Sequence, residues 1–448
     1  MLSILFAAVQ FVTINPGHLN AALVQSRMYE SVSADVLVYA PGGDELKSHL
    51  SLIRQFNTRT ENPTAWREGV YAGADFLKRF EKDAAIRPAA ENAEKIVILA
   101  GRNNVKPDYY LAGVEAGLNV LSDMPMAITP DDYMKLCDAA AVAKDRGLLF
   151  WDIATERHEM TSILQRELSR VVGVYGMQES GTLDDPAVAK VSVRHFCRFA
   201  DGKPLRRPGW YYDTKQQGEA IVDATAHLVD IVQWSLFPNQ SLKRSDVKML
   251  AARIWNTPIS AEDYRKSTGL KVWPAFLKKS VDGDNVLQCR ANGEFTYTLR
   301  GVHAKVSVVR NFSAPEGTGD THCSYMRGSN AELVIRQGSK QGFRPVLYVK
   351  LREGADRGKT ESALNAALAK IGERYPGIAA VSPGGEEDGA AWKIHVPEKY
   401  DIGHEARISQ AVRQFLGWMK EGKMPEMERR NLLVKYYTLV QAWRMSRR

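Results

Sequence analysis

The chain has 448 residues, of which 44% are apolar and 25% charged, so it is long enough for two domains with separate cores. Its net charge is +8, but the basic residues are scattered and form no stripe with interleaved aromatics, so nucleic-acid binding is not expected. The four cysteines include no CxxC pair, which argues against zinc and redox motifs and is typical of reduced thiols.

The N-terminal segment, residues 1–14, is apolar but has neither a basic start nor a small-residue cleavage site. No run in the chain approaches the ~20 apolar residues of a membrane span, so no membrane partner is expected. We therefore expect a cytoplasmic protein, with a periplasmic one as the alternative if an export signal was trimmed.

Strands and helices alternate through the first third of the chain. The expected strands are Gln10–Ile14, Asp35–Ala40, Lys95–Ala100, Val120–Leu121 and Leu148–Asp152. The expected helices are Leu19–Met28, Glu45–Phe56, Asp108–Gly117 and Pro130–Arg146. This alternation predicts a doubly wound, Rossmann-like parallel sheet over residues 1–155.

In such sheets, ligands bind outside the carboxyl ends of the strands. Four segments follow strand ends and should surround one crevice: Asn15–His18, Gly101–Asn104, Ser122–Pro125 and Asp152–Arg157. The sequence therefore predicts a ligand site at this edge of the first domain.

The turn after the first strand lacks the G-x-G-x-x-G pattern of dinucleotide-binding proteins. Gly17 still permits close approach of a pyrophosphate, and the N-terminus of the next helix offers N–H groups. The predicted contacts are Pro16, Gly17, His18 and Leu19. The alternative is a plain strand–turn–helix without a ligand.

The acid that binds ribose normally ends the second strand. Asp35 lies at the wrong end of that strand, so Asp44, just past Pro41–Gly43, is the nearest candidate. The choice between NAD and NADP stays open.

After about Val172 the pattern changes to consecutive strands with short turns, which predicts a mostly antiparallel sheet. The expected strands are Val188–Phe199, Val247–Trp255, Glu294–Leu299, Ala304–Arg310, Ala331–Arg336 and Pro345–Leu351. A helix over Glu361–Tyr375 and paired helices over Ile408–Arg447 complete an α+β domain, residues 156–448, for substrate binding and oligomerisation.

One expected helix, Gly218–Asp230, interrupts this sheet and carries a polar line. Asp223, His227 and Asp230 lie at positions i, i+4 and i+7 and would share one face. His227 is a candidate proton carrier because its unperturbed pKa is near neutrality. The alternative is a buried histidine that the two acids hold for structure alone. No histidine or cysteine has metal-ligand spacing, so no metal site is expected.

The segment Ala116–Thr129 resembles the "AGKHVLCEKPLA.T" segment of the glucose–fructose oxidoreductase/inositol dehydrogenase (Gfo/Idh/MocA) family. In that family, the lysine of Glu-Lys-Pro lies beside the nicotinamide and the reacting sugar carbon. Here that position is Met124. The helix over residues 218–234 likewise resembles the family's "GG.l.D.g.H.iD...w" helix, in which the first acid and the histidine bind sugar hydroxyls and move the proton.

The resemblance also covers residues 95–156, and the segments 209–218 and 435–438 are similar to a subgroup of sugar oxidoreductases with a distinct C-terminal domain. It implies an NAD(P)-dependent oxidoreductase that acts on a CH–OH group of a sugar or glycoside, and a homo-oligomer. The implied catalytic positions are His227, Asp223, Met124 and Lys215. The implied cofactor contacts are the four turn residues named above together with Ala40, Asp44, Ala100, Gly101, Asn103, Asn104, Asp123, Pro125 and Asp152.

Methionine has no charge and no hydrogen-bond donor, so Met124 leaves three explanations open. The chain is slow or inactive but still binds cofactor and sugar, or His227 moves the proton without help, or Lys215 replaces the missing lysine. Two other functions also remain: glycoside cleavage through a 3-keto sugar with recycling of the cofactor, and a non-catalytic sensor of nucleotide or sugar.

Overall fold

The computed structural model describes residues 9–85, 94–197, 199–200, 203–204, 206–385 and 389–448. The chain forms two compact units. Unit 1 comprises residues 1–155, 215–218 and 403–436, and unit 2 comprises residues 156–214, 219–402 and 437–448. The first boundary coincides with the expected one at residue 155. The C-terminal helices do not stay in the second domain as expected, because most of their length belongs to unit 1.

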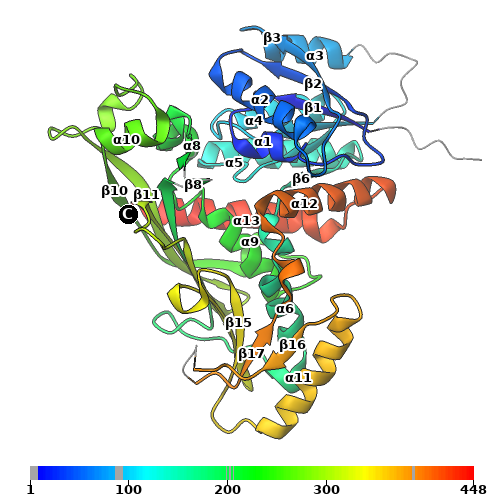
Figure 1. Cartoon of the computed structure of the whole chain (residues 1–448), viewed down its shortest axis with the longest axis vertical. Coiled ribbons are helices and arrows are strands. Elements are labelled where there is room, and N and C mark those ends of the chain that lie inside the picture. The colour runs from blue at the N-terminus through cyan, green and yellow to red at the C-terminus, as the bar shows by residue number, and fades with distance from the viewer. Residues whose placement is uncertain (1–8, 86–93, 198, 201–202, 205, 386–388) are drawn as a thin grey trace, which may run out of the picture. The chain divides into compact units, whose positions relative to one another are not determined.

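Unit 1 is built on a six-stranded parallel sheet of order β3-β2-β1-β4-β5-β6 (Figure 1). Its strands are β1 (Gln10–Ile14), β2 (Asp35–Ala40), β3 (Arg67–Ala72), β4 (Lys95–Leu99), β5 (Asn119–Ser122) and β6 (Phe150–Asp152). The central strands are runs of buried apolar residues, as a sheet covered on both faces requires. The Rossmann-like expectation is confirmed.

The first five helices of unit 1 alternate with its strands, and the others come from later in the chain. They are α1 (Leu19–Leu23), α2 (Asp44–Thr58), α3 (Phe76–Ala85), α4 (Lys106–Glu115), α5 (Pro130–Asp145), α8 (Thr214–Gln217), α12 (Gly403–Lys420) and most of α13 (Glu426–Met445). Helix α1 ends at Leu23 rather than Met28, because the amides of Gln25 and Ser26 turn back to the carbonyls of Ala22 and Leu23. Strand β3 and helix α3 were not predicted, since β3 is an edge strand without an apolar run.

Unit 2 is built on a nine-stranded sheet of order β10-β11-β12-β7-β13-β14-β15-β17-β16, whose strands carry the green-to-orange colours in Figure 1. The strands are β7 (Val188–Cys197), β10 (Val247–Ser260), β11 (Val286–Leu299), β12 (Val302–Ser313), β13 (Thr321–Arg327), β14 (Ala331–Gln337), β15 (Val346–Leu351), β16 (Ala379–Val381) and β17 (Trp392–His395). The sheet is mostly antiparallel as expected, but β12 and β7 pair in parallel. The short hairpin β8 (Phe199–Ala200) and β9 (Lys203–Pro204) forms a separate sheet.

The helices of unit 2 are α6 (Met160–Ser169), α7 (Val172–Tyr175), α9 (Thr225–Leu236), α10 (Ala261–Thr268) and α11 (Arg357–Gly372). Helix α9 packs against β12 and β7, and α6 packs against β14. The helix expected over Gly218–Asp230 begins only at Thr225, so Asp223 lies in the turn before it. Within the described residues, no helix is both long and apolar enough to cross a membrane.

Candidate functional site

The strand order of unit 1 reverses between β1 and β4, and the two segments that follow these strands meet there. The amides of Gly17 and His18 both donate to the carbonyl of Ala100, each at 3.1 Å. A Cβ atom at Gly101 would lie 2.5 Å from the carbonyl oxygen of Asn15, so only glycine fits. The backbone of these two segments therefore borders the position where parallel sheets of this type bind ligands.

The first turn is held by Asn15, which has a φ of 46°. Asparagine tolerates this left-handed conformation better than most residues. Its side-chain amide donates to the hydroxyl of Tyr109 at 2.9 Å. Because the Gly17 and His18 amides are already bonded to Ala100, the next amide, that of Leu19, is the one in this turn that forms no hydrogen bond among the described residues.

His18 caps helix α1 and faces Asp123. The Nδ1 atom of His18 lies 3.3 Å from the amide of Asn20 and 3.4 Å from Oδ2 of Asp123. The side-chain amide of Asn20 donates to the same carboxylate oxygen at 3.0 Å. His18 and Asp123 were both predicted as cofactor contacts, and the structure brings them together.

The segment after β2 presents bare backbone. Gly42 and Gly43 have φ of 92° and 87°, and a Cβ atom at either position would meet nothing within 4 Å. Asp44, the predicted ribose ligand, starts helix α2, and its side chain is exposed and lies 3.2 Å from Lys47. Ala40 ends β2 and is buried.

The loop after β4 is fixed by the segment 215–218 of the same unit. The amides of Asn103 and Asn104 donate to the carbonyl of Gln216 at 2.9 and 3.1 Å. The side chain of Asn103 donates to the carbonyl of Gln217 at 2.6 Å. Asn103 and Asn104 thus already form hydrogen bonds within the protein. The exposed Lys215 is the first residue of the segment that accepts these bonds.

Met124 lies in a buried turn, with 5% of its surface exposed, before a cis peptide bond to Pro125. The ammonium group of Lys106 donates to the carbonyls on both sides of Met124, at 2.9 Å to Asp123 and 3.2 Å to Pro125. Lys106 is itself 2% exposed. The turn around Met124 therefore contains a buried cation that was not predicted from the sequence.

Asp152 is enclosed rather than open to a ligand. Its carboxylate oxygens lie 2.9 and 2.8 Å from the ammonium of Lys435, and the hydroxyl of Tyr436 donates to Oδ2 at 2.8 Å. The same hydroxyl accepts from the amide of Met126 at 2.9 Å. The carboxylate predicted to contact the cofactor is committed to helix α13 and supports the Met124 turn.

In unit 2, the two acids of the predicted polar line are held by arginines. Arg157 binds Asp230 through two hydrogen bonds of 2.7 and 2.8 Å, and both residues are buried. Arg310 donates to Asp223 through one longer bond of 3.3 Å. His227 lies between these acids in the sequence and is half-buried at the start of α9. Asp230 is thus engaged by Arg157.

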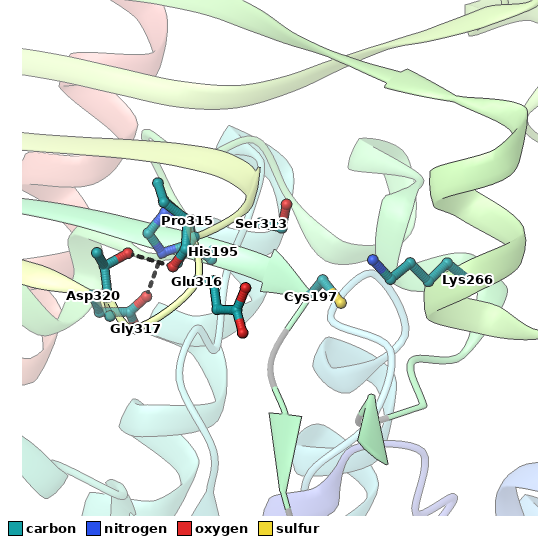
Figure 2. Close-up of a pocket in the computed structure, with 11 residues that line it drawn as sticks. His195, Cys197, Lys266, Ser313, Pro315, Glu316, Gly317 and Asp320 are labelled. Carbon is teal, nitrogen blue, oxygen red and sulfur yellow. Dashed lines mark hydrogen bonds and ion pairs between the residues drawn. The ribbon is translucent and has the colours of Figure 1, made fainter. Parts of the chain in front are cut away.

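A second polar feature of unit 2 is a cavity of about 760 Å³ beside the connection between β12 and β13 (Figure 2). Buried His195 forms a 2.9 Å contact with Asp320 there. Cys197, Lys266 and Glu316 also line this cavity. This cavity was not predicted from the sequence, because its lining comes from strands, a helix and a loop that are far apart in the chain.

Buried polar groups also follow the inner side of β7. Lys190 binds the side chain of Gln165 at 2.6 Å, and burial lowers the pKa of Lys190 to about 7. His322 pairs with Ser192 at 2.8 Å, and burial and then Lys190 lower the pKa of His322 to about 4. The described residues contain no group of three ligands suited to a metal ion.

The parallel sheet of unit 1, with its switch point between β1 and β4, and the mixed sheet of unit 2 define an α/β protein of two units, the first of them Rossmann-like. Residues 164–447 match the family "Putative oxidoreductase C terminal domain". Because the match spans more than half of the chain, the protein belongs to this oxidoreductase family. Comparison with curated proteins gave no sequence match.

Solved structures extend the likeness to the whole chain. An oxidoreductase from Parabacteroides merdae is 45% identical over 98% of both chains, with a TM-score of 0.92. An oxidoreductase domain protein from Kribbella flavida is 15% identical over 98% of this chain and 97% of that one, with a TM-score of 0.63. KijD10, a 3-ketoreductase from Actinomadura kijaniata solved with NADP and TDP-benzene, is 14% identical over 98% of both chains, with a TM-score of 0.56. The last two show a common fold.

Proposed function

We propose that the protein is an NAD(P)-dependent oxidoreductase that acts on a CH–OH group of a sugar or glycoside. The observation that carries this proposal is the close backbone approach of the two loops at the switch point of the parallel sheet, where a Cβ atom at Gly101 would lie 2.5 Å from the carbonyl oxygen of Asn15 and 3.3 Å from the amide nitrogen of Gly17. The oxidoreductase family and the NADP-bound neighbour KijD10 support it.

The residues of unit 1 fit a dinucleotide with one change from the sequence expectation. The amide of Leu19, rather than those of Gly17 and His18, is the donor available to a pyrophosphate. The open backbone of Gly42 and Gly43, next to Asp44, suits the adenosine ribose. When bound, the nicotinamide supplies the hydride acceptor, and the protein supplies orientation and proton transfer.

Asp223 and His227 are the groups we propose for the substrate. His227 would take the hydroxyl proton, since imidazole titrates near neutrality. The carboxylate of Asp223, which accepts a 3.3 Å hydrogen bond from Arg310, would accept a sugar hydroxyl. Lys215 remains the alternative source of a charged donor.

The experiment combines nucleotide binding with turnover. We expect calorimetry to detect NAD or NADP binding, and a sugar panel to give turnover that His227→Ala lowers by about 10²–10⁴-fold in kcat. His395→Ala, an exposed histidine of β17, is the matched control. Absence of binding by either nucleotide at millimolar concentration would remove the proposal, and unchanged kinetics of His227→Ala would remove the role of His227.

A non-catalytic sensor is the second candidate, because Met124 is buried and uncharged and stands where the resemblance to the Gfo/Idh/MocA segment implies a lysine. Nucleotide and sugar binding without turnover would favour it. Release of aryl groups from aryl glycosides without net change in the nicotinamide would instead indicate cofactor-recycling glycoside cleavage.

A further inference from the structure

Two arginines stand side by side on the inner side of the unit 2 sheet. Strands β12 and β7 pair in parallel with Arg310 opposite Arg194. Register partners in neighbouring strands point to the same side, and the strands lie only about 4.8 Å apart. Helix α9 packs on these two strands, so both guanidinium groups share the side that carries Asp223.

The charge of this arginine pair is only partly balanced. Arg310 is 8% exposed, and its one side-chain hydrogen bond among the described residues is the 3.3 Å contact with Asp223. Arg194 is half-buried, and its guanidinium group forms no hydrogen bond or ion pair within the described part of the chain. By contrast, Arg157 forms a two-point ion pair with Asp230 of α9. Among the described residues, the ion pair between Arg310 and Asp223 is thus the only one that these two guanidinium groups form.

Arg310 is nevertheless rigidly placed. Its amide donates to Asn292 at 2.8 Å, and its carbonyl accepts from Thr257 at 2.7 Å. Its guanidinium lies 5.2 Å from the ring centroid of Phe196 and 5.8 Å from that of Tyr211. A fixed guanidinium with donors to spare is preorganised for an oxyanion.

Side-by-side like charges on neighbouring strands destabilise a fold, so the pair calls for a ligand of opposite charge. We infer that Arg194 and Arg310 form a subsite for an oxyanion on the substrate, a carboxylate or a phosphate, next to Asp223. This deepens the proposed function and rests on it in taking the ligand to be a sugar. The favoured substrates are then acidic sugars rather than neutral ones.

The test measures binding directly by calorimetry, with D-glucuronate, D-glucose 6-phosphate and D-glucose as probes of the nucleotide-saturated protein. We expect the wild-type protein to bind one of the two anions more tightly than glucose, and which of them it prefers identifies the oxyanion. Arg194→Met should lower the affinity for that anion by about ten- to a hundredfold and leave the affinity for glucose unchanged. Arg194→Lys should retain part of the affinity.

The same variant distinguishes a role of Arg194 in ligand binding from a role in the stability of the fold. Because Arg194→Met removes a repulsion, the thermal midpoint without ligand should not fall, while anion affinity does. The matched control is Arg253→Met. Arg253 lies in β10 and forms an exposed ion pair with Glu294 of β11, so this variant should change neither the thermal midpoint nor the anion affinity. Equal binding of all three sugars by the wild-type protein, or equal loss for anion and glucose in Arg194→Met, overturns the inference. This test measures binding and not turnover. A protein that binds acidic sugars without turning them over would therefore contradict the proposed reaction and still support the oxyanion subsite.

Discussion

At the scale of single residues, Met124 is the residue that suits the proposed reaction least, because its side chain has neither a charge nor a hydrogen-bond donor. The residue is buried, and the carbonyls on both sides of it are held by Lys106. We expect Met124→Lys to raise kcat at least about tenfold, with a smaller change in KM, because a charged donor returns to a water-poor turn. Steady-state kinetics measure this.

Lys106 gives that experiment its internal check. A second ammonium close to Lys106 is disfavoured, so the gain in kcat should appear only as pH falls below the lowered pKa of the new lysine. If the wild-type chain already turns over at about 1–10³ s⁻¹ and Met124→Lys slows it, the argument from Met124 is wrong.

His49 in α2 predicts an acid-sensitive fold. The side chain is 4% exposed, neither ring nitrogen has a hydrogen-bond partner among the described residues, and burial lowers its pKa to about 4. The unfolded chain therefore binds a proton near pH 6.5, before the folded chain does. The contribution of His49 to the free energy of unfolding is fully present above pH 6.5 and is lost as the pH falls toward 4.

From this shift we expect His49 to account for a loss of about 2 kcal/mol between pH 7.5 and pH 5. Urea unfolding of the wild-type protein and of His49→Leu at both pH values measures it. The variant should show a shallower pH dependence, whereas the exposed control His395→Gln should not. Identical slopes for wild type and His49→Leu would contradict the assignment.

At the scale of elements, helix α13 supports the end of β6 through a buried ion pair. Lys435 and Asp152 have side chains that are 1% and 0% exposed. Lys435→Met would leave a buried carboxylate without its cation, so we expect a loss of about 3–5 kcal/mol in the free energy of unfolding. Denaturant unfolding provides the measurement.

The double variant Lys435→Met with Asp152→Asn removes both charges and should recover much of that loss. Arg430→Met on the same helix breaks an exposed pair with Glu426 and should change stability by less than about 1 kcal/mol. A double variant as unstable as Lys435→Met would show that packing, not the unpaired charge, is responsible.

At the scale of the whole molecule, unit 1 is assembled from distant parts of the chain. Helix α12 buries Ile408, Val412 and Phe415, and its Trp418 packs edge-on against Trp151 of β6 at 4.8 Å between ring centroids. Each such side chain contributes about 1.5–3 kcal/mol when fully buried. Residues 1–155 therefore lack part of their own core.

We expect residues 1–155 expressed without the rest to unfold at a much lower temperature than the same residues joined by a flexible linker to residues 403–436. Circular dichroism melting curves and resistance to proteolysis compare the two. Equal melting midpoints would mean that the C-terminal helices add nothing to unit 1. The expected homo-oligomer stays a prediction at this scale.

Much of unit 1 was predictable because its signals are local. Strands β1, β2 and β4 are β-branched apolar runs, and α4 is followed by Gly117, which has a φ of 77°. Thr129 caps α5 and forms a reciprocal capping box with Asp132. These features are decided within a few residues, so the sequence by itself determined the Rossmann-like domain, whereas its ligand edge stays a prediction.

Other features were decided only by the tertiary structure. The parallel pairing of β7 with β12, which sets Arg194 beside Arg310, joins strands more than 100 positions apart in the chain. The enclosure of Asp152 by Lys435 and the placement of Lys106 beneath Met124 depend in the same way on how separate elements pack. The periodicity of a sequence indicates which face of an element is apolar, but it does not indicate which distant side chains that face will contact. Those tertiary contacts determine how charges are arranged at the candidate site.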